Sequence, residues 1–426
     1  MDRSEEVLAH SEDTLDVLCI KGNGANAQTL IEAEVDKADI VIAATASDEI
    51  NMLCCLMAKK LGAGYAIARI RDPEYNQSLT MLQREMDIDM TINPERATAL
   101  EISRLLRFPF ASNIESFARG RVEMVEFHVH ENDPIVGVPM KELSKRLRGI
   151  PQVLYCAIDR DGEVIIPSGD TTILSGDKVH VAADMITITA YFRFLGKYSK
   201  RVKNVMILGG GKISYYLAKM LAPTGVQVSI IEESRQAARE LAEMLPEVTV
   251  ICGDGTDQDV LEQEGLGHTD AFVTLAERDE ENFMTGLYAV KRGVPKVIVK
   301  NTHSFYVDLI ADMGLESVVS PKAITCSTIL RYVRARTASE GSAVEKLYRR
   351  VDGKVEALEF VAQAGAPYIG RPLKELTIRK NTRVAVIVRH GRVIVPFGND
   401  HIEAGDSVII VASESGLGDL NEVIMD

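Results

Sequence analysis

The sequence predicts an α/β protein with two doubly wound parallel-sheet domains, each followed by a small α+β domain. Two observations lead to this prediction. Short apolar segments alternate with helical segments in the second half, which is typical of a parallel sheet with helices on both faces. In addition, the two halves of the 426-residue chain carry the same motifs in the same order.

The repeat has an offset of 231 positions in the parallel-sheet domains (279 − 48). Matching residues there are 39–42, Asp48 and Asn51 in the first half, and 270–273, Asp279 and Asn282 in the second. In the small domains, 137–143 resembles 370–376, and 176–179 resembles 405–408. The order A–B–A′–B′ indicates a duplicated gene. We expect domains at 1–119, 120–202, 203–345 and 346–426.

The elements of the second parallel-sheet domain follow from its apolar pattern. We expect strands at 203–208, 226–231, 248–252, 271–275 and 296–300, and helices at 212–222, 234–245 and 280–292. The small domains differ, because their strands alternate and are joined by Gly-Asp and Asp-Gly turns. Their expected strands in the first copy are 122–129, 153–158 and 178–182, and the basic stretch 197–203 is expected to link the halves.

A glycine-rich turn, Gly209-Gly210-Gly211-Lys212-Ile213-Ser214, lies where a strand becomes a helix. In a dinucleotide fold the first glycine makes a tight turn, and the second lets the backbone approach a pyrophosphate at the helix N-terminus. The third position packs helix against strand, and here it is Ser214 instead of glycine. The alternative is a tight turn that binds no ligand.

Three further positions strengthen the nucleotide interpretation. Glu232 closes the second strand, 21 residues after Gly211 (232 − 211), where a carboxylate can accept both ribose hydroxyls. Gly253-Asp254 ends the third strand, and Lys300 ends a later one, where it could reach a phosphate. The alternatives are a surface carboxylate, an ordinary turn and a solvated lysine.

The first half has no equivalent glycine loop in this sequence. Asp2 precedes Gly22 by 20 positions (22 − 2), and Glu232 precedes Gly253 by 21 (253 − 232), so we place Asp2 where Glu232 stands. The first strand, glycine turn and first helix of this copy would then lie before residue 1. We expect either an incomplete N-terminus or a shortened paralogue, and a sheet with exposed strand edges and apolar faces.

Composition excludes several classes of protein. A formal net charge of −14 repels nucleic acid and anionic lipid. The first twenty residues contain no secretory signal, and no apolar run approaches the roughly 18 residues of a membrane helix. The six cysteines form no CxxC pair and no metal-ligand spacing, which favours reduced thiols and no metal site. We expect a soluble cytoplasmic protein without direct membrane insertion.

The motifs together resemble the TrkA family, the peripheral subunits of Trk-type potassium transporters. The resemblance covers essentially the whole chain, and four segments carry it: 22–24, 45–51, 67–71 and 209–214. Members of that family contain two RCK (KTN) domains. Each has a Rossmann-like N-terminal part and a small C-terminal RCK subdomain. A plain dehydrogenase would not be expected to show the motifs at 45–51 and 67–71, still less to show both twice.

The resemblance implies ligands, partners and residue roles. The family binds NAD(H), related modules bind ATP or ADP, and the partner would be the membrane-embedded transporter subunit. A homo-oligomeric ring of four tandem chains is also implied. In the first copy the implied nucleotide-binding residues are Asp2, Gly22, Asn23, Thr45, Ala46 and Arg69. In the second they are Gly209, Gly210, Gly211, Lys212, Ile213, Glu232, Gly253, Asp254, Ala276 in place of Thr45, and Lys300 in place of Arg69.

The resemblance implies a regulatory subunit that binds a nucleotide and gates a potassium transporter, and two other functions compete with this one. An NAD-dependent oxidoreductase needs an acid–base residue near the nicotinamide, yet none of the eight histidines recurs at an equivalent place in both copies. His128 and His130 face one side of a predicted strand and could bind a metal, but exposed strand histidines are the favoured interpretation. A nucleotide-sensing transcription regulator is disfavoured, since there is no basic recognition helix. No catalytic residue is therefore predicted.

Overall fold

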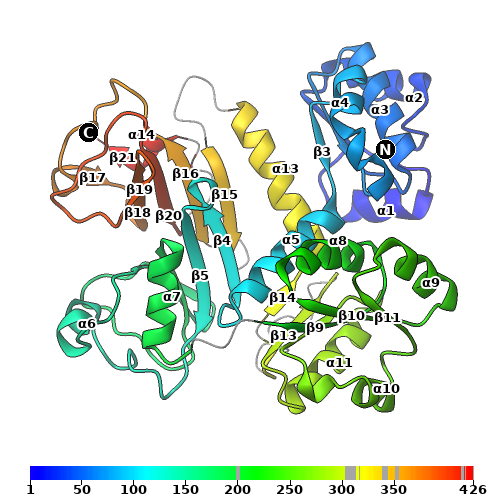
Figure 1. Cartoon of the computed structure of the whole chain (residues 1–426). Helices are drawn as coiled ribbons and strands as arrows, with labels where there is room; N and C mark the ends of the chain where they lie inside the picture. The colour runs from blue at the N-terminus through cyan, green and yellow to red at the C-terminus, as the bar shows by residue number, and fades with distance from the viewer. Residues whose placement is uncertain are drawn as a thin grey trace. The chain divides into compact units, whose positions relative to one another are not determined.

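A computed structural model describes residues 1–197, 202–302, 313–315, 317–337, 344–350, 355–413, 417 and 419–425. Residues 198–201 of the expected linker, and Tyr306, which the repeat aligns with Tyr75, lie outside these ranges. By its internal contacts the chain divides into two compact units, Met1–Thr98 and Ala99–Asp426 (Figure 1).

The larger unit contains a six-stranded parallel sheet with the order β11-β10-β9-β12-β13-β14. This reversal of direction beside the first strand is the doubly wound order, so the predicted fold class is confirmed. The strands are β9 (Asn204–Leu208), β10 (Gln227–Glu232), β11 (Thr249–Cys252), β12 (Ala271–Thr274), β13 (Lys296–Lys300) and β14 (Ser317–Val319). The helices are α8 (Lys212–Leu221), α9 (Arg235–Met244), α10 (Gln258–Gln263), α11 (Asp279–Lys291) and α13 (Pro321–Thr337).

Successive strand residues point to opposite faces, and each face of this sheet has its own core. Ile207 and Val273 pack against Leu217 of α8 on one face. Phe272 packs with Phe283 of α11 on the other, and Figure 1 shows α8 and α11 on opposite sides of the sheet. The α8 face also receives Ala99, Ile102, Leu105 and Leu106 of helix α5 (Pro94–Arg107).

The smaller unit contains a three-stranded parallel sheet, β1 (Ile40–Ala43), β2 (Tyr65–Arg69) and β3 (Met90–Ile92), in that order. Its helices are α1 (Glu5–Thr14), α2 (Ala27–Glu32), α3 (Asp48–Leu61) and α4 (Leu79–Glu85). Asp2 and Lys21 form an isolated parallel bridge, and the residues that the repeat aligns with them, Glu232 of β10 and Cys252 of β11, pair in the other copy.

One edge of β1 is unpaired among the residues that the structure describes. The equivalent strand β12 pairs with β9 on one side and β13 on the other, whereas β1 pairs with β2 alone. As a result Ile42 is 46% exposed, while Val273 at the equivalent position is 0% exposed. Val17 and Val248 differ in the same way, at 51% and 9%. The predicted exposure of a strand edge and an apolar face is confirmed.

The two small domains share one antiparallel topology, β4-β5-β8-β6-β7 in the first and β15-β16-β20-β18-β19 in the second. The first contains β4 (Asn113–Phe117), β5 (Val122–His128), β6 (Leu154–Arg160), β7 (Glu163–Ile165), β8 (Lys178–Ala183), α6 (Met140–Arg146) and α7 (Met185–Phe194). The second contains β15 (Val344–Arg350), β16 (Val355–Val361), β18 (Thr382–Arg389), β19 (Arg392–Ile394) and β20 (Ser407–Ala412), with β17 (Thr377–Ile378), α14 (Leu420–Val423) and β21 (Ile424–Met425).

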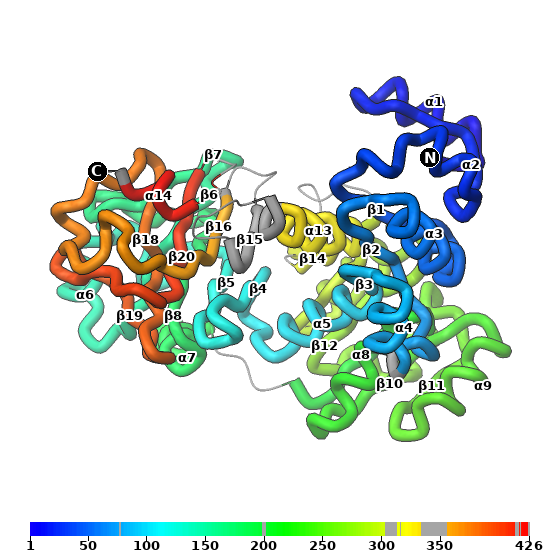
Figure 2. Tube along the Cα trace, turned by 90° about the horizontal axis from the view of Figure 1, so that it is seen from above, coloured from blue at the N-terminus to red at the C-terminus, as the bar shows by residue number. Residues whose placement is uncertain are grey.

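The two antiparallel sheets pack against each other through a shared apolar core, and Figure 2 shows their strands side by side. Met124 of β5 and Val386 of β18 belong to this core. The backbone amide of Ala118 also donates a 2.9 Å hydrogen bond to the buried carboxylate of Glu359. The small domains thus form one body within the larger unit.

Candidate nucleotide-binding clefts

The three glycines of the turn after β9 differ in the space that a side chain would have at each position. Gly209 has φ 95°, and a β-carbon there would lie 2.9 Å from the backbone of Leu275, so no other residue fits. A β-carbon on Gly210 would lie 2.8 Å from Oε2 of Glu232. One on Gly211 would meet no atom within 4 Å. Gly211, which is the second glycine position of the dinucleotide-binding motif, therefore borders open space, where a ligand could approach.

Ser214 replaces the third glycine of the motif without disturbing the turn. Its side chain is fully buried, and Oγ donates a 2.5 Å hydrogen bond to the carbonyl oxygen of Gly209. Ile213 packs against the core beneath the sheet, and Lys212 is exposed at the helix start. The serine therefore stabilises the glycine turn that the motif requires.

Helix α8 starts directly at this turn and has ten residues. Within the described part of the chain, no side chain caps this helix at its N-cap, Gly211. Aligned peptide dipoles make this end of a helix positive. The position thus suits a pyrophosphate.

Glu232, the last residue of β10, connects the glycine turn to the strand beside it. Its Oε2 accepts a 2.7 Å hydrogen bond from the amide of Gly210, and its Oε1 accepts one of 2.8 Å from the amide of Ser234. Its carbonyl oxygen accepts one of 3.0 Å from the amide of Gly253. The carboxylate is partly exposed at the position where a dinucleotide fold binds ribose.

The remaining predicted residues of this copy lie at the same edge, because the parallel strands all end there. Gly253 and Asp254 follow β11, and a hydrogen bond from the Thr256 hydroxyl lowers the pKa of Asp254. Lys300 ends β13, where burial lowers its pKa against the opposing effect of nearby Asp279 and Glu277. The glycine turn, the carboxylate, the uncapped helix and the lysine all fit a bound dinucleotide.

Asn282 fixes the loop after β12, a role that the sequence motif did not reveal. Its side chain accepts a 2.8 Å hydrogen bond from the amide of Ala276 and donates one of 3.0 Å to the carbonyl oxygen of Ala276. Asn51 does the same for Thr45 in the first copy, with bonds of 2.7 and 3.1 Å. The recurrence of this asparagine at the same offset was the signal available for it.

In the first unit, Asp2 repeats two of the three contacts of Glu232, and the contact with the glycine turn has no counterpart among the described residues. Its carbonyl oxygen accepts from the amide of Gly22 at 2.9 Å, and its Oδ1 accepts from the amide of Ser4 at 2.9 Å. The bridge to Lys21 completes the match with β10 and β11. Asn23 lies in the following turn, where its Oδ1 accepts from the amide of Ala25 at 3.2 Å.

Two arginines hold the loop that follows β1. Nη2 of Arg69 donates to the carbonyl oxygen of Thr45 at 2.6 Å, and Nη2 of Arg71 donates to that of Ala46 at 2.5 Å. Burial lowers the pKa of Arg69, and the neighbouring charge of Arg71 acts in the same direction. The structure therefore brings Thr45, Ala46 and Arg69 together and adds Arg71, which was not among the predicted site residues.

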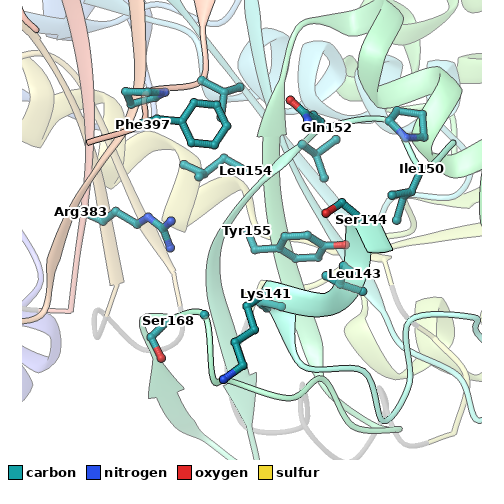
Figure 3. Close-up of a pocket in the computed structure, with 16 residues that line it drawn as sticks. Lys141, Leu143, Ser144, Ile150, Gln152, Leu154, Tyr155, Ser168, Arg383 and Phe397 are labelled. Carbon is teal, nitrogen blue, oxygen red and sulfur yellow. The ribbon is translucent and has the colours of Figure 1, made fainter. Parts of the chain in front are cut away.

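A separate cavity of about 300 Å³ lies between the two small domains (Figure 3). Lys141 and Tyr155 line it from the first domain, and Arg383 and Phe397 line it from the second. Nη1 of Arg383 donates to the carbonyl oxygen of Pro167 at 2.7 Å. None of the predicted nucleotide-binding residues lines this cavity.

The described ranges contain neither a metal-ligating cluster nor a helix of membrane-spanning length. No three His, Cys, Asp or Glu side chains there are grouped to hold a metal ion. In the same part of the chain, no helix is long and apolar enough to span a bilayer. His130 is placed by Lys197, whose Nζ lies 2.7 Å from its Nδ1.

The chain contains two copies of a parallel-sheet domain followed by a small antiparallel domain, and one copy has a complete glycine turn. This arrangement defines a tandem nucleotide-binding module. Family comparison agrees with this class. The TrkA-N domain matches residues 1–94 and 205–321, and the TrkA-C domain matches 124–196 and 357–425. The chain belongs to the TrkA family, and the resemblance noted in the sequence is confirmed.

Relatives match over nearly their whole length. Trk system potassium uptake protein TrkA homolog 1 of Methanosarcina mazei is 30% identical over 430 residues, which cover 99% of this chain and 93% of the relative. The TrkA homolog of Archaeoglobus fulgidus is 32% identical, with 96% and 90% covered. TrkA of Vibrio alginolyticus is 31% identical, with 96% and 89% covered.

Solved structures share the fold at lower identity. The GsuK channel has a TM-score of 0.62 at 16% identity, with 99% of this chain and 72% of that chain covered. The GsuK RCK domain has a TM-score of 0.60 at 17% identity, with 96% and 86% covered. The GsuK channel bound to NAD has a TM-score of 0.60 at 16% identity, with 96% and 71% covered.

Proposed function

We propose that this protein is a nucleotide-binding regulatory subunit that gates a Trk-type potassium uptake channel. The observation that carries the proposal is the group of residues at the carboxyl edge of the larger parallel sheet. There an open glycine turn, an uncapped helix and the carboxylate of Glu232 lie together. Membership of the TrkA family supports a role of this site in potassium uptake.

The proposed ligand of this cleft is NAD(H), with ATP or ADP as the alternative. The backbone from Gly209 to Ile213 would surround the pyrophosphate, Glu232 would accept the ribose hydroxyls, and Lys300 would neutralise phosphate charge. When bound, NAD supplies a ligand that distinguishes conformations, and no chemical step on it is required. The fold shared with the NAD-bound GsuK channel supports this assignment.

The proposed partner is the membrane-embedded transporter subunit, which would hold this protein at the inner face of the cell membrane. A ring of four tandem chains would present eight modules to it. A nucleotide can gate such an assembly only by binding one conformation more tightly than another. The regulatory effect is therefore limited by the difference between the two affinities.

Calorimetry with NADH and ATP tests the binding site. Glu232→Ala and Gly211→Asp should each weaken binding by at least roughly tenfold, because one removes the ribose acceptor and the other puts a carboxylate beside the pyrophosphate. Glu240→Ala, an exposed carboxylate on α9, is the control and should bind as the wild type does. Unchanged affinity in the first two variants would refute the site.

A second measurement separates regulation from catalysis. Co-expression with the matching transporter subunit should restore potassium uptake in a deficient host, and the Glu232→Ala variant should restore it less. The alternative is an NAD-dependent oxidoreductase, which would consume NADH steadily with a small substrate. Such turnover, without restored uptake, would replace the regulatory proposal by the enzymatic one.

A further inference from the structure

The cavity between the two small domains has mainly apolar walls, and the charged residues that line it are cations. Its volume of about 300 Å³ lies at the small end of the range for ligand pockets. The cations are Lys141 of α6 and Arg383 of β18, and no Asp or Glu is among the described residues that line it. The whole chain, by contrast, has a formal net charge of −14. A positive and largely apolar cavity in an acidic protein indicates a ligand that is anionic and partly apolar.

Arg383 is a half-buried cation whose charge is not offset by a neighbouring acid. Its Nη1 donates a 2.7 Å hydrogen bond to the carbonyl oxygen of Pro167, and no carboxylate pairs with its guanidinium within the described part of the chain. Figure 3 shows the side chain extending toward the cavity. A guanidinium has five N–H donors in a planar fork, so one bond to a neutral carbonyl leaves its charge and most of its donors available. An anion in the cavity would offset this charge and accept from these donors.

Lys141 supplies a second cation, which differs from Arg383 because it already has a partner. Its ammonium pairs with Asp170, and the two side chains are 59% and 83% exposed. Water screens an ion pair that is so exposed, and such a pair contributes little to stability. Lys141 therefore adds positive charge at the rim of the cavity, while Arg383 is the group that we expect to bind the anion.

The apolar walls fit the body of such a ligand. Phe397 lines the cavity from the second small domain and is 65% exposed, so a ligand that covers its ring removes apolar surface from water. Leu154 and Tyr155 line it from the first small domain. The hydroxyl of Tyr155 lies 2.9 Å from that of Tyr191, which leaves the ring to form the wall. An aromatic ring or a branched chain bound here would contact both domains.

The repeat shows that the fold requires neither Arg383 nor Phe397. At the offset of 229 that relates β6 to β18, Arg383 corresponds to Leu154 (383 − 154) and Phe397 corresponds to Ser168 (397 − 168). All four residues line this cavity, because the two small domains pack against each other. The first copy keeps the same topology without this cation and this aromatic ring. The chemistry of the cavity therefore comes from side chains that are specific to the second copy.

We infer that this cavity binds a small organic carboxylate with an apolar body, of the aryl or branched aliphatic class. Arg383 binds the carboxylate group, and Phe397 and Tyr155 cover the apolar body. The site is separate from both nucleotide clefts and goes beyond the proposed function. Because its walls come from both small domains, the ligand favours the arrangement in which these domains are joined.

Binding of hydrocinnamate to the full chain tests the inference. The sequence contains no tryptophan, so Phe397→Trp places a single fluorescent side chain at the cavity and keeps an aromatic wall. Hydrocinnamate should change its fluorescence in a saturable way. Hydrocinnamyl alcohol, which has the same body without the charge, should bind at least roughly tenfold more weakly. Calorimetry on the wild-type chain measures the same two affinities without any substitution.

A second substitution separates the charge of Arg383 from its structural role. Arg383→Gln keeps a donor for the carbonyl oxygen of Pro167 but removes the charge. It should weaken hydrocinnamate at least roughly tenfold and change the affinity for the alcohol less than about twofold. Arg392→Gln, which removes an exposed cation of β19 outside the cavity, is the matched control and should change neither affinity.

Two results would overturn the inference. One is the absence of saturable hydrocinnamate binding below about 10 mM. The other is equal affinity for the acid and the alcohol, which would show that the cavity does not recognise the anion. Should Arg383→Gln not fold, the comparison of acid and alcohol on the wild-type chain still decides the question. Either negative result leaves the proposed function intact, because none of the predicted nucleotide-binding residues lines this cavity.

Discussion

The backbone amide of Gly210 donates a 2.7 Å hydrogen bond to Oε2 of Glu232, so the carboxylate proposed to bind ribose also holds the glycine turn. Hydrogen bonds to an ionised acceptor are about twice as strong as neutral ones. The turn is therefore ordered before any ligand arrives. A ligand that binds Glu232 would act on the same group that holds the proposed phosphate-binding loop.

The neighbouring glycines Gly210 and Gly211 should respond differently to alanine. Gly211→Ala adds a methyl group to open space at φ −71°, so the free energy of unfolding should stay within about 0.5 kcal/mol of wild type. Nucleotide binding should nevertheless weaken, because the methyl group takes the space where the pyrophosphate approaches. Gly210→Ala should lower both stability and binding, because its β-carbon would contact the Glu232 carboxylate. Urea unfolding and calorimetry measure the two effects, and equal stability losses would contradict this account.

Asn282→Ala should lower the free energy of unfolding by about 2–3 kcal/mol, because the amide and carbonyl groups of Ala276 lose their partner in a buried site. Asn421→Ala is the control. That side chain is exposed, bonds only to Asp419 in the described part of the chain, and should cost less than about 0.5 kcal/mol. Both values come from urea unfolding. A loss below about 1 kcal/mol for Asn282→Ala would mean that water replaces the side chain.

Lys300 should make nucleotide binding to the second cleft sensitive to alkaline pH. Burial disfavours its charged form and lowers its pKa, so it loses its proton at a lower pH than an exposed lysine. Phosphate affinity should fall as the pH rises through that lowered pKa. Because a bound phosphate raises the pKa again, binding in this range should take up a proton.

The variant Lys300→Arg supplies the control for this pH dependence. Arginine stands at the equivalent position of the first copy, as Arg69, and keeps its charge throughout the accessible pH range. Calorimetry in two buffers of different ionisation enthalpy measures the proton uptake. An alkaline decline that persists unchanged in Lys300→Arg would assign the titration to another group.

Hydrogen exchange should distinguish strand β1 from its counterpart β12. The amides of Ile40–Ala43 border an edge that is unpaired among the described residues, whereas those of Ala271–Thr274 lie between two strands. Amides near an open edge exchange through small local openings. Peptides covering β1 should therefore exchange at least about 100-fold faster than peptides covering β12. Equal protection would show that β1 is paired in solution.

Much of the second parallel-sheet domain could be predicted from local pattern. Five of its strands and three of its helices lie within about two residues of the expected ranges, because a buried parallel strand and an amphipathic helix each leave a short periodic signature. Helices α10 and α13 and strand β14 had no expected range. The glycine turn and Glu232 could be placed by spacing, since the ends of parallel strands share one edge. Asp2 could be aligned with Glu232 because a duplicated chain keeps its offsets.

The repeat, the order of strands and helices and the residues at the sheet edge could be predicted without a structure, because they are properties of short segments and fixed spacings. Tertiary structure alone decided that α5 packs on the second sheet, that the small domains share a core, and that Ala118 contacts Glu359, 241 positions away. It also decided that Arg71 joins Arg69 at the Thr45 loop. Such contacts depend on shape and burial between distant segments, which no local pattern encodes.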